Sequence, residues 1–267
     1  MEIVNKIVVV SGASSGIGES IAKAMSRAGA GKVLLLARNE ESLKRVVNEV
    51  ESGGGKAGYY VVDLSSLDGV TSVSQRILNE VGVPDILVNN AGSGQWKYLE
   101  ETTPEEISQM VAVPYLAAAW LSRAFLPGML RRGSGHIVNI SSVASRFVWP
   151  GATAYTAARW AVRGFTEALR ADLYGTGIGV TLYESGEIES PYWQHNPGSR
   201  ERIPKIGKML IPVLSREEVG RAVVDGVRGN KRLIVIPFMM KLIYLQHFLF
   251  PWAVQWLMTV TGYRRQR

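Results

Sequence analysis

The feature that most constrains the fold is a regular alternation of short apolar runs with longer stretches of helical periodicity. The run KIVVV at residues 6–10 is compact and β-branched, as is typical of a buried parallel strand, and residues 17–29 carry apolar side chains at helical spacing. This alternation predicts an α/β protein with a doubly wound parallel sheet of about seven strands and helices on both faces. We expect further strands at 32–36, 59–62, 85–88, 136–140, 179–183 and 234–236, and further helices at 40–51, 104–130 and 157–174.

Length and composition limit the possible classes of protein. With 267 residues, 46% of them hydrophobic, and no repeat or low-complexity linker, residues 1–233 are predicted to form one domain, followed by an apolar tail at 234–267. The absence of cysteine excludes disulfides and thiolate chemistry and fits a cytoplasmic location. The net charge of +7 favours anionic partners, but the basic residues are dispersed, so we expect no nucleic acid. No metal site is predicted.

A glycine-rich turn follows the first predicted strand and opens the first predicted helix. Its spacing is G-x-x-x-G-x-G, and glycines at such a turn let backbone N–H groups approach a pyrophosphate at the positive end of a helix. The alternative is a purely structural turn. If the turn binds a dinucleotide, the contacting residues are Gly12, Ser14, Ser15, Gly16, Ile17 and Gly18.

Three more signals lie just after predicted strands, where ligands bind in such sheets. The second strand is followed by Ala37 and Arg38 rather than by an acidic residue, which favours the 2′-phosphate of NADP(H) over NAD(H), unless Arg38 only opens a charged helix. The third strand is followed by Asp63 and Leu64, where a carboxylate suits an adenine amino group. The fourth strand is followed by small and amide residues suited to a ribose, namely Asn89, Asn90, Ala91 and Gly92.

Over about residues 5–230 the chain resembles the short-chain dehydrogenase/reductase family. The resemblance rests on the glycine turn, Asp63, the NNAG run at 89–92, Ser141-Ser142 and Tyr155, with Ser142 thirteen positions before Tyr155. It implies a Rossmann-type sheet and hydride transfer between NADP(H) and a carbonyl or alcohol. It also implies that Tyr155 is the general acid/base, that Ser142 polarises the substrate oxygen, and that the cofactor contacts Tyr155, Arg159, Gly186 and Ile188.

Three positions depart from the family pattern. Arg159 replaces a lysine, Pro114 replaces an asparagine, and Ser185-Gly186 replaces Pro-Gly. An unperturbed phenol has a pKa of about 10, so a nearby cation must stabilise the phenolate, and a guanidinium still supplies that charge although it does not relay protons as a lysine can. Because proline bends a helix, we expect a bend at Pro114 that is built into the fold.

The departures leave three functions open. The first is a working NADP(H)-dependent reductase with a modified proton relay, and the second is a cofactor-binding protein with little redox turnover. The third is a non-redox isomerase or lyase that uses Tyr155 or Glu187 as its base. Glu184 and Glu187 flank the turn after the sixth strand, where one of them could act as acid or base, although partners for nearby cations are the commoner role of such carboxylates.

The segment 191–215 corresponds to the part of the family that closes over the substrate. Trp96, Tyr192 and Trp193 are its predicted wall residues, with Phe147 and Trp149 as further candidates. Several aromatic side chains at one cleft indicate a bulky apolar substrate. The alternative is ordinary packing of aromatic residues against helices.

The tail is apolar and aromatic, and 242–260 is almost free of charge but marginal as a transmembrane span. Its tryptophans and the arginines at 264, 265 and 267 favour an interfacial anchor for peripheral membrane contact. The alternative is burial against another subunit or over the substrate entrance. We also expect a homo-oligomer, a dimer or tetramer, through the helices at 104–130 and 157–174, where Trp160, Val162 and Phe165 lie.

Overall fold

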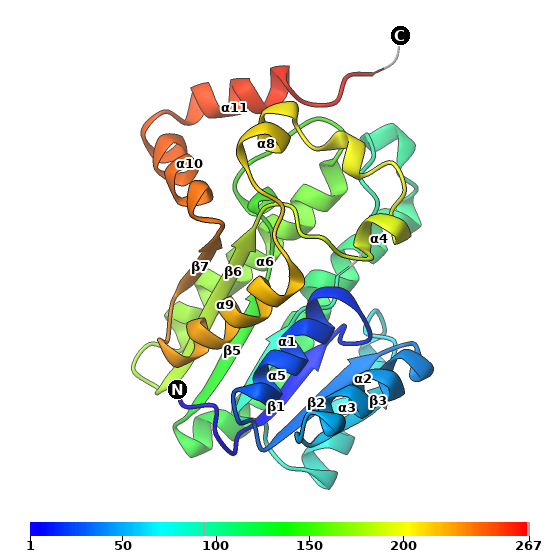
Figure 1. Ribbon diagram of the computed structural model, residues 1–267, viewed down its shortest axis with the longest axis vertical. Helices are drawn as coiled ribbons and strands as arrows, with labels where there is room; N and C mark the ends of the chain where they lie inside the picture. Colours follow the sequence, from blue (N-terminus) through cyan, green and yellow to red (C-terminus); the bar gives the residue numbers. More distant parts are fainter. Residues whose placement is uncertain (93, 266–267) are drawn as a thin grey trace.

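The computed structural model, which describes residues 1–92 and 94–265, confirms the predicted architecture (Figure 1). A single seven-stranded sheet has the order β3-β2-β1-β4-β5-β6-β7, and every neighbouring pair is parallel. The strands are β1 (Ile7–Ser11), β2 (Lys32–Ala37), β3 (Ala57–Val61), β4 (Ile86–Asn89), β5 (Gly135–Ile140), β6 (Ile178–Ser185) and β7 (Leu233–Ile236).

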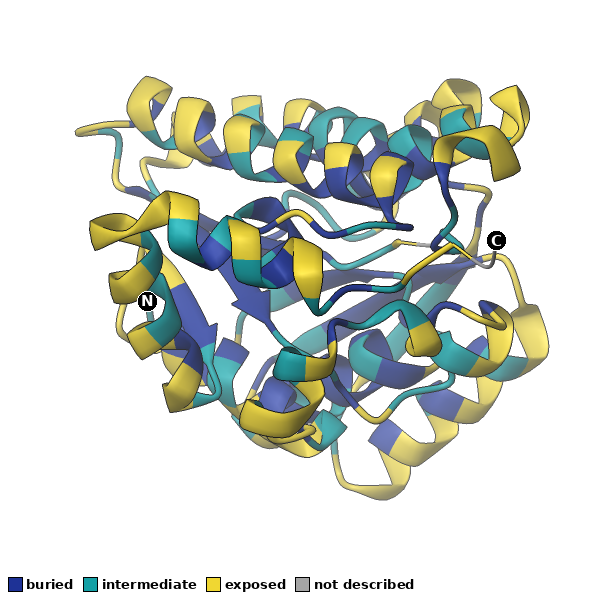
Figure 2. Ribbon diagram, turned by 90° about the horizontal axis from the view of Figure 1, so that it is seen from above, coloured by how far each residue is buried: buried dark blue, intermediate teal, exposed yellow. Residues whose placement is uncertain are grey.

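Helices cover both faces of the sheet (Figure 2). Apolar side chains of α1, α2 and α9 join one core cluster, and those of α3, α5 and α6 join the cluster on the opposite face. The bounds are α1 (Gly16–Arg27), α2 (Glu40–Ser52), α3 (Leu67–Glu80), α5 (Ala117–Arg132), α6 (Thr153–Asp172) and α9 (Arg216–Arg228).

Two helices that pack against the sheet, α3 and α9, were not among the predicted elements. In α3 the apolar positions Val70, Val73 and Ile77 have helical spacing and are buried, and the Ser66 side chain caps the helix by accepting from the N–H of Gly69. The signal was therefore present, but glycine and several polar residues weakened it.

Helix α6 begins four residues earlier than predicted, at Thr153. This start places Tyr155 in the first turn of the helix and Arg159 one turn later. Residues four apart lie on the same helix face, so the two side chains are held together by local geometry.

The predicted helix at 104–130 is interrupted. It consists of α4 (Pro104–Val111), a π-helical segment at Ala112–Leu116 and α5. Pro114 lies inside the π-helical segment and is buried, so the irregularity expected at the proline is part of the fold. The combined stretch Pro104–Arg132 is long and apolar enough to cross a membrane by length and composition, but Leu121 and Phe125 are fully buried in the core against the sheet.

The tail forms two helices, α10 (Phe238–Leu249) and α11 (Pro251–Val260), which gather with α8 (Lys205–Leu210) at the end of the molecule where the strands end (Figure 1). Each tail helix is shorter than the roughly 20 residues of a membrane span. Of the three arginines in the predicted anchor, Arg264 and Arg265 are exposed and Arg267 lies outside the described residues.

Three of the hydrogen bonds that attach the tail to the rest of the chain are accepted by main-chain carbonyls. The Gln255 side chain donates to the Val148 carbonyl at 3.0 Å, and the Lys205 N–H donates to the Thr261 carbonyl at 3.0 Å. The Tyr98 hydroxyl donates to the carbonyl of Tyr263 at 2.9 Å. The tail is therefore packed on the chain's own loops, as in the alternative to the favoured membrane anchor, namely that it lies over the substrate entrance.

Candidate active site

One cavity of about 910 Å³ lies beyond the carboxyl ends of the strands. In a sheet whose strand order reverses at β1 and β4, this is the expected place for a ligand. The cavity extends from the glycine turn to the tail helices. The predicted site residues that line it are Gly12, Ser14, Ser15, Gly16, Ile17, Arg38, Asp63, Leu64, Asn90, Ala91, Gly92, Trp96, Ser142, Tyr155, Arg159, Gly186, Ile188, Tyr192 and Trp193.

Two predicted cofactor residues, Gly18 and Asn89, do not line the cavity. A Cβ atom on Gly18 would lie 2.2 Å from the carbonyl oxygen of Gly12, so this glycine permits close packing of helix α1 against the turn. Asn89 is buried, and its side-chain amide donates to the Asn139 side chain at 2.8 Å, bridging β4 and β5. Both residues lie behind the cavity wall and support the residues that line it, and their direct contact with a cofactor stays a prediction.

The glycine turn is held by a residue that the sequence analysis missed. The Ser11 hydroxyl at the end of β1 accepts from the N–H groups of Asn90 and Ala91 at 2.9 and 3.0 Å. The Asn90 side chain in turn donates to the carbonyl of Gly12 at 3.1 Å. The loops after β1 and β4 are therefore locked together at the point where the strand order reverses. In the sequence, the serine directly before the first glycine of the turn was the signal that could have indicated this role.

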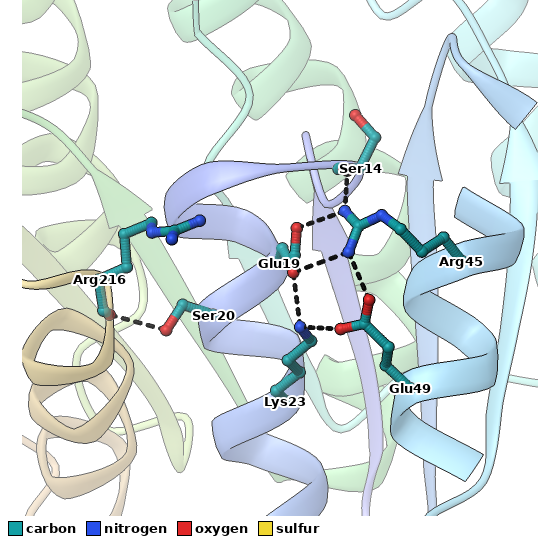
Figure 3. A network of polar contacts seen from close by, with 7 residues as sticks. All are labelled: Ser14, Glu19, Ser20, Lys23, Arg45, Glu49 and Arg216. Atoms are coloured by element: carbon teal, nitrogen blue, oxygen red, sulfur yellow. Dashed lines mark hydrogen bonds and ion pairs between the residues drawn. The ribbon is translucent and has the colours of Figure 1, made fainter. Parts of the chain in front are cut away.

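A second missed element is a network of charged side chains that joins α1 to α2 (Figure 3). The Arg45 guanidinium pairs with Glu19 and Glu49 at 2.6 Å each and donates to the carbonyl of Ser14 at 3.3 Å. Although burial acts in the opposite direction, hydrogen bonds from Arg45 and Lys23 lower the pKa of the Glu19 carboxyl. The network therefore fixes the backbone of the glycine turn from its outer side.

At the far end of the cavity, Arg38 and Asp63 follow β2 and β3. Hydrogen bonds from the backbone and hydroxyl of Ser65, with the positive charge of Arg38, lower the pKa of the Asp63 carboxyl. Within residues 1–92 and 94–265 no carboxylate forms an ion pair with Arg38, which is exposed. Its guanidinium is therefore available to an anionic group in the cavity.

Tyr155 and Arg159 are both buried at the middle of the cavity. The guanidinium carbon of Arg159 lies 5.0 Å from the centre of the Tyr155 ring, and one guanidinium nitrogen donates to the Ile140 carbonyl at 3.2 Å. A side chain at Gly92 would meet another guanidinium nitrogen at 2.8 Å, which explains the glycine there. In the part of the chain that the structure describes, the Arg159 Nε has no partner. A buried cation with a free donor thus lies beside the phenol.

Ser142 lies in a tight turn directly after β5. Its hydroxyl accepts from the N–H of Ala144 at 3.3 Å, and its carbonyl accepts from the N–H of Ser145 at 3.0 Å. The turn presents Ser142 to the same cavity as Tyr155.

Aromatic side chains form the wall opposite the glycine turn. The Trp96 ring lies 5.2 Å from the Tyr155 ring, 5.1 Å from that of Trp149 and 5.6 Å from that of Trp193. The Tyr192 hydroxyl accepts from the Trp96 indole at 3.1 Å and donates to the Gly94 carbonyl at 2.5 Å. Burial raises the pKa of Tyr192, so it remains a neutral donor. All five predicted wall aromatics, including Phe147, line the cavity, and we name this region the aromatic chamber.

The two glutamates at and just after the end of β6, Glu184 and Glu187, are both paired with arginines. Glu184 does not line the cavity; it is fully buried and pairs with Arg146 at 2.7 Å. Glu187 lines the cavity but pairs with Arg200 at 2.6 Å. Pro114 is also absent from the lining, where its neighbour Val113 is found. Both carboxylates therefore pair with cations, the commoner of the two roles considered for them, and Glu184 lies outside the cavity in which an acid or base would act.

A parallel sheet with a glycine turn over its switch point, and a cavity that continues into an aromatic chamber, defines a dinucleotide-binding α/β protein. The chain belongs to the short chain dehydrogenase family, whose sequence profile matches residues 6–200, and the family is one of oxidoreductases.

Two curated relatives and one solved structure illustrate this membership. The chain is 38% identical over 192 residues to a short chain dehydrogenase of Pseudocercospora fijiensis, a match that covers 71% of this chain and 62% of the fungal protein. It is 30% identical over 263 residues to the dehydrogenase/reductase SDR family protein 7-like of Drosophila melanogaster, covering 96% of this chain and 80% of the fly protein. An alcohol dehydrogenase from Thermococcus sibiricus, solved with 5-hydroxy-NADP, is 26% identical with a TM-score of 0.75, covering 86% and 95% of the two chains.

Proposed function

We propose that the protein is an NADP(H)-dependent oxidoreductase that transfers hydride between the nicotinamide and a carbonyl or alcohol of a bulky apolar substrate. The observation that carries the proposal is the buried Arg159 guanidinium beside the Tyr155 ring, in a cavity that joins the glycine turn to the aromatic chamber. A buried cation is costly unless it has a charged or polar partner, and a phenol that becomes a phenolate supplies one.

The residues present fit a phosphorylated dinucleotide. The backbone of the glycine turn is accessible because side chains are absent at Gly12 and Gly16, which have φ values of 65° and 60°. The Arg159 side chain lines the cavity beside Tyr155, where its guanidinium could donate to a ribose hydroxyl, and Arg38 is free to contact a 2′-phosphate. The relative from Thermococcus sibiricus holds an NADP derivative, which supports the same preference here.

The chain's own groups would then divide the chemistry. The bound cofactor supplies or accepts hydride at the substrate carbon. The Tyr155 hydroxyl donates a proton to the substrate oxygen in reduction and accepts it in oxidation, and Arg159 stabilises the phenolate left in between. The Ser142 hydroxyl donates a hydrogen bond to the oxygen as negative charge develops on it.

The test is to incubate the protein with NADPH and a panel of bulky apolar ketones and aldehydes, and to follow both NADPH oxidation and alcohol formation. Matched consumption of NADPH and formation of alcohol would establish the function. Cofactor binding without turnover would favour a binding protein, and conversion without NADPH consumption would favour an isomerase or lyase.

Arg38 provides a direct prediction about the cofactor. Replacing it by alanine should raise the KM for NADPH about tenfold and change the KM for NADH less than about twofold, because only the phosphorylated cofactor loses a charge-assisted contact. Arg27→Ala removes the same charge from an exposed position outside the cavity and serves as the control. Equal effects of Arg38→Ala on both cofactors would argue against a 2′-phosphate contact.

The tail supports peripheral membrane contact as a second part of the proposal. Its outer surface exposes large apolar side chains, and 237–265 contains no acidic residue but has Lys241, Arg264 and Arg265, of which Arg265 pairs with Glu100 at 2.6 Å. An apolar surface with cations around it complements an anionic bilayer surface of a cytoplasmic membrane leaflet. The most exposed apolar residues of the tail are Phe238, Leu245, Phe248, Leu249, Trp252 and Trp256.

Replacing both Trp252 and Trp256 by serine should weaken binding to vesicles of phosphatidylcholine and phosphatidylserine by at least about tenfold, because two indoles no longer enter the interface. Cosedimentation measures the effect. Tyr174→Ser removes an aromatic ring that is 92% exposed just after α6, away from the tail, and should leave binding unchanged. Failure of the unmodified protein to bind such vesicles would refute the membrane contact.

We also propose a homo-oligomer formed through α5 and α6. Trp160 is 46% exposed on α6 and offers an apolar contact, whereas Val162 is buried in the protein and its expected place in an interface was wrong. Light scattering that returns the mass of one chain would contradict this proposal.

A further inference from the structure

We propose that Glu184 is a positioning residue that couples the docking of tail helix α10 to the turn that holds Ser142. The inference rests on the proposed function, since it assigns a partner to the Ser142 turn. It starts from a carboxylate that is fully buried at the end of β6, outside the cavity, at the edge of the substrate region. A buried carboxylate of this kind requires donors on all sides.

The donors of Glu184 come from two separate parts of the chain. Two belong to the turn after β5: the Ser145 hydroxyl contacts one carboxylate oxygen, and the Arg146 Nε donates to the other at 2.7 Å. The third is the Tyr244 hydroxyl of α10, which donates to the same oxygen as Arg146 at 3.1 Å. Glu184 is therefore the junction between the catalytic turn and the tail.

On the turn side, the connection reaches Ser142 directly. The Ser145 hydroxyl lies within hydrogen-bond distance of both the Glu184 carboxylate and the Ser142 carbonyl, at 2.7 Å from the latter. The N–H of Ser145 also donates to the Ser142 carbonyl, and Arg163 donates to the Ser145 carbonyl at 3.1 Å. Movement of Ser145 therefore moves the backbone that carries the Ser142 hydroxyl.

On the tail side, Tyr244 is held firmly against the same turn. The Arg146 guanidinium lies 4.7 Å from the centre of the Tyr244 ring, and the Phe147 ring lies 5.4 Å from it in an edge-on arrangement. Burial raises the pKa of Tyr244, so its hydroxyl keeps the proton that it donates to Glu184. Met240 and Ile243 of α10 line the aromatic chamber. Helix α10, which forms one wall of the chamber, is thus attached through Tyr244 to the turn that carries Ser142.

This arrangement gives a physical link between two events. When α10 is seated, Glu184 has its full set of donors and the Ser142 turn is held in one conformation. When α10 moves away, the carboxylate loses the Tyr244 hydroxyl, and the Arg146 guanidinium and the Phe147 ring lose the Tyr244 ring that they pack against. The turn is then free to shift, so an open chamber would have a less well-positioned Ser142 than a closed one.

Tyr244→Phe tests the link with the smallest change, because it removes only the donated hydrogen bond. We expect kcat to fall about tenfold with the KM for NADPH unchanged, and amide hydrogen exchange in 143–147 to speed up. Glu184→Gln changes the acceptor of the same hydrogen bond, so it should also lower kcat, leave the KM for NADPH unchanged and speed up exchange in 143–147. Tyr263→Phe is the control. The hydrogen bond that Tyr98 donates to residue 263 is accepted by its main-chain carbonyl, so loss of the Tyr263 hydroxyl should change neither kcat nor hydrogen exchange in 143–147.

Hydrogen exchange and cofactor binding need no turnover, so they separate this inference from the proposed function. Faster exchange in 143–147 of Tyr244→Phe would support the coupling even if no substrate were converted. Faster exchange confined to α10, with 143–147 unchanged, would overturn it, as would a kcat equal to that of the unmodified enzyme. If Glu184→Gln failed to fold, Tyr244→Phe would still decide between these outcomes.

Discussion

Replacing Tyr155 by phenylalanine is expected to lower kcat by about 10² to 10⁴-fold while leaving the dissociation constant of NADPH within about threefold of its original value. The substitution removes the hydroxyl that exchanges a proton with the substrate oxygen but keeps the ring that packs against Trp96 and Arg159. Steady-state reduction of a bulky apolar ketone gives kcat, and quenching of tryptophan fluorescence by NADPH gives the dissociation constant.

The matched control is Tyr192→Phe, because the Tyr192 ring lies 6.5 Å from the Tyr155 ring in the same chamber. Its hydroxyl is occupied by the Gly94 carbonyl and the Trp96 indole, so its loss should disturb substrate affinity more than kcat. If Tyr155→Phe retained most of its turnover, the proton would have to come from another group, and Glu187 in the cavity lining would become the first candidate.

Most of the fold could be predicted from the sequence because its signals are local. Runs such as KVLLL at 32–36 form strands that are buried on both faces of a parallel sheet. Such strands consist almost entirely of apolar residues, so they are easy to recognise in the sequence. The missed helix α3 shows the limit of such reasoning. Its three buried apolar residues are separated only by polar ones, and packing against α5 on the same face of the sheet is what makes them a continuous surface.

The candidate site could be predicted as a set of positions but not as a set of contacts. Residues that follow parallel strands must meet at one edge, which brings Asp63, Ser142 and Tyr155 to one cavity. Whether a side chain at that edge faces the ligand or the protein depends on neighbours from distant segments. Asn89 turns toward Asn139, fifty residues away, and Glu184 turns toward Tyr244 in the tail. No short stretch of sequence contains either pair.

The tail was the least predictable part for the same reason. Its composition indicates only that it must be covered by something apolar. In the structure only part of the tail is covered. Met240 and Met258 line the aromatic chamber, whereas Phe248 and Trp252 are exposed on the outer surface. Both interpretations of the tail, as a cover for the substrate entrance and as an apolar outer surface, are therefore compatible with one arrangement of two short helices.

The second large effect is expected at Arg159. Replacing it by methionine should lower kcat at neutral pH about a thousandfold, because the cation stabilises the phenolate, and two unit charges about 4 Å apart attract each other by about 4 kcal/mol at an effective dielectric constant of about 20. Methionine is long enough to fill much of the buried space beside the Tyr155 ring, so the fold should survive. Circular dichroism and NADPH binding check that it does.

Arg159→Lys is the decisive comparison, because it keeps the positive charge and changes only its shape. If the charge beside the phenol is what matters, the lysine variant should retain at least about a tenth of the original kcat, while the methionine variant should not. Equal loss in both variants would mean that the shape of the guanidinium and its bond to the Ile140 carbonyl, rather than its charge, make Tyr155 competent.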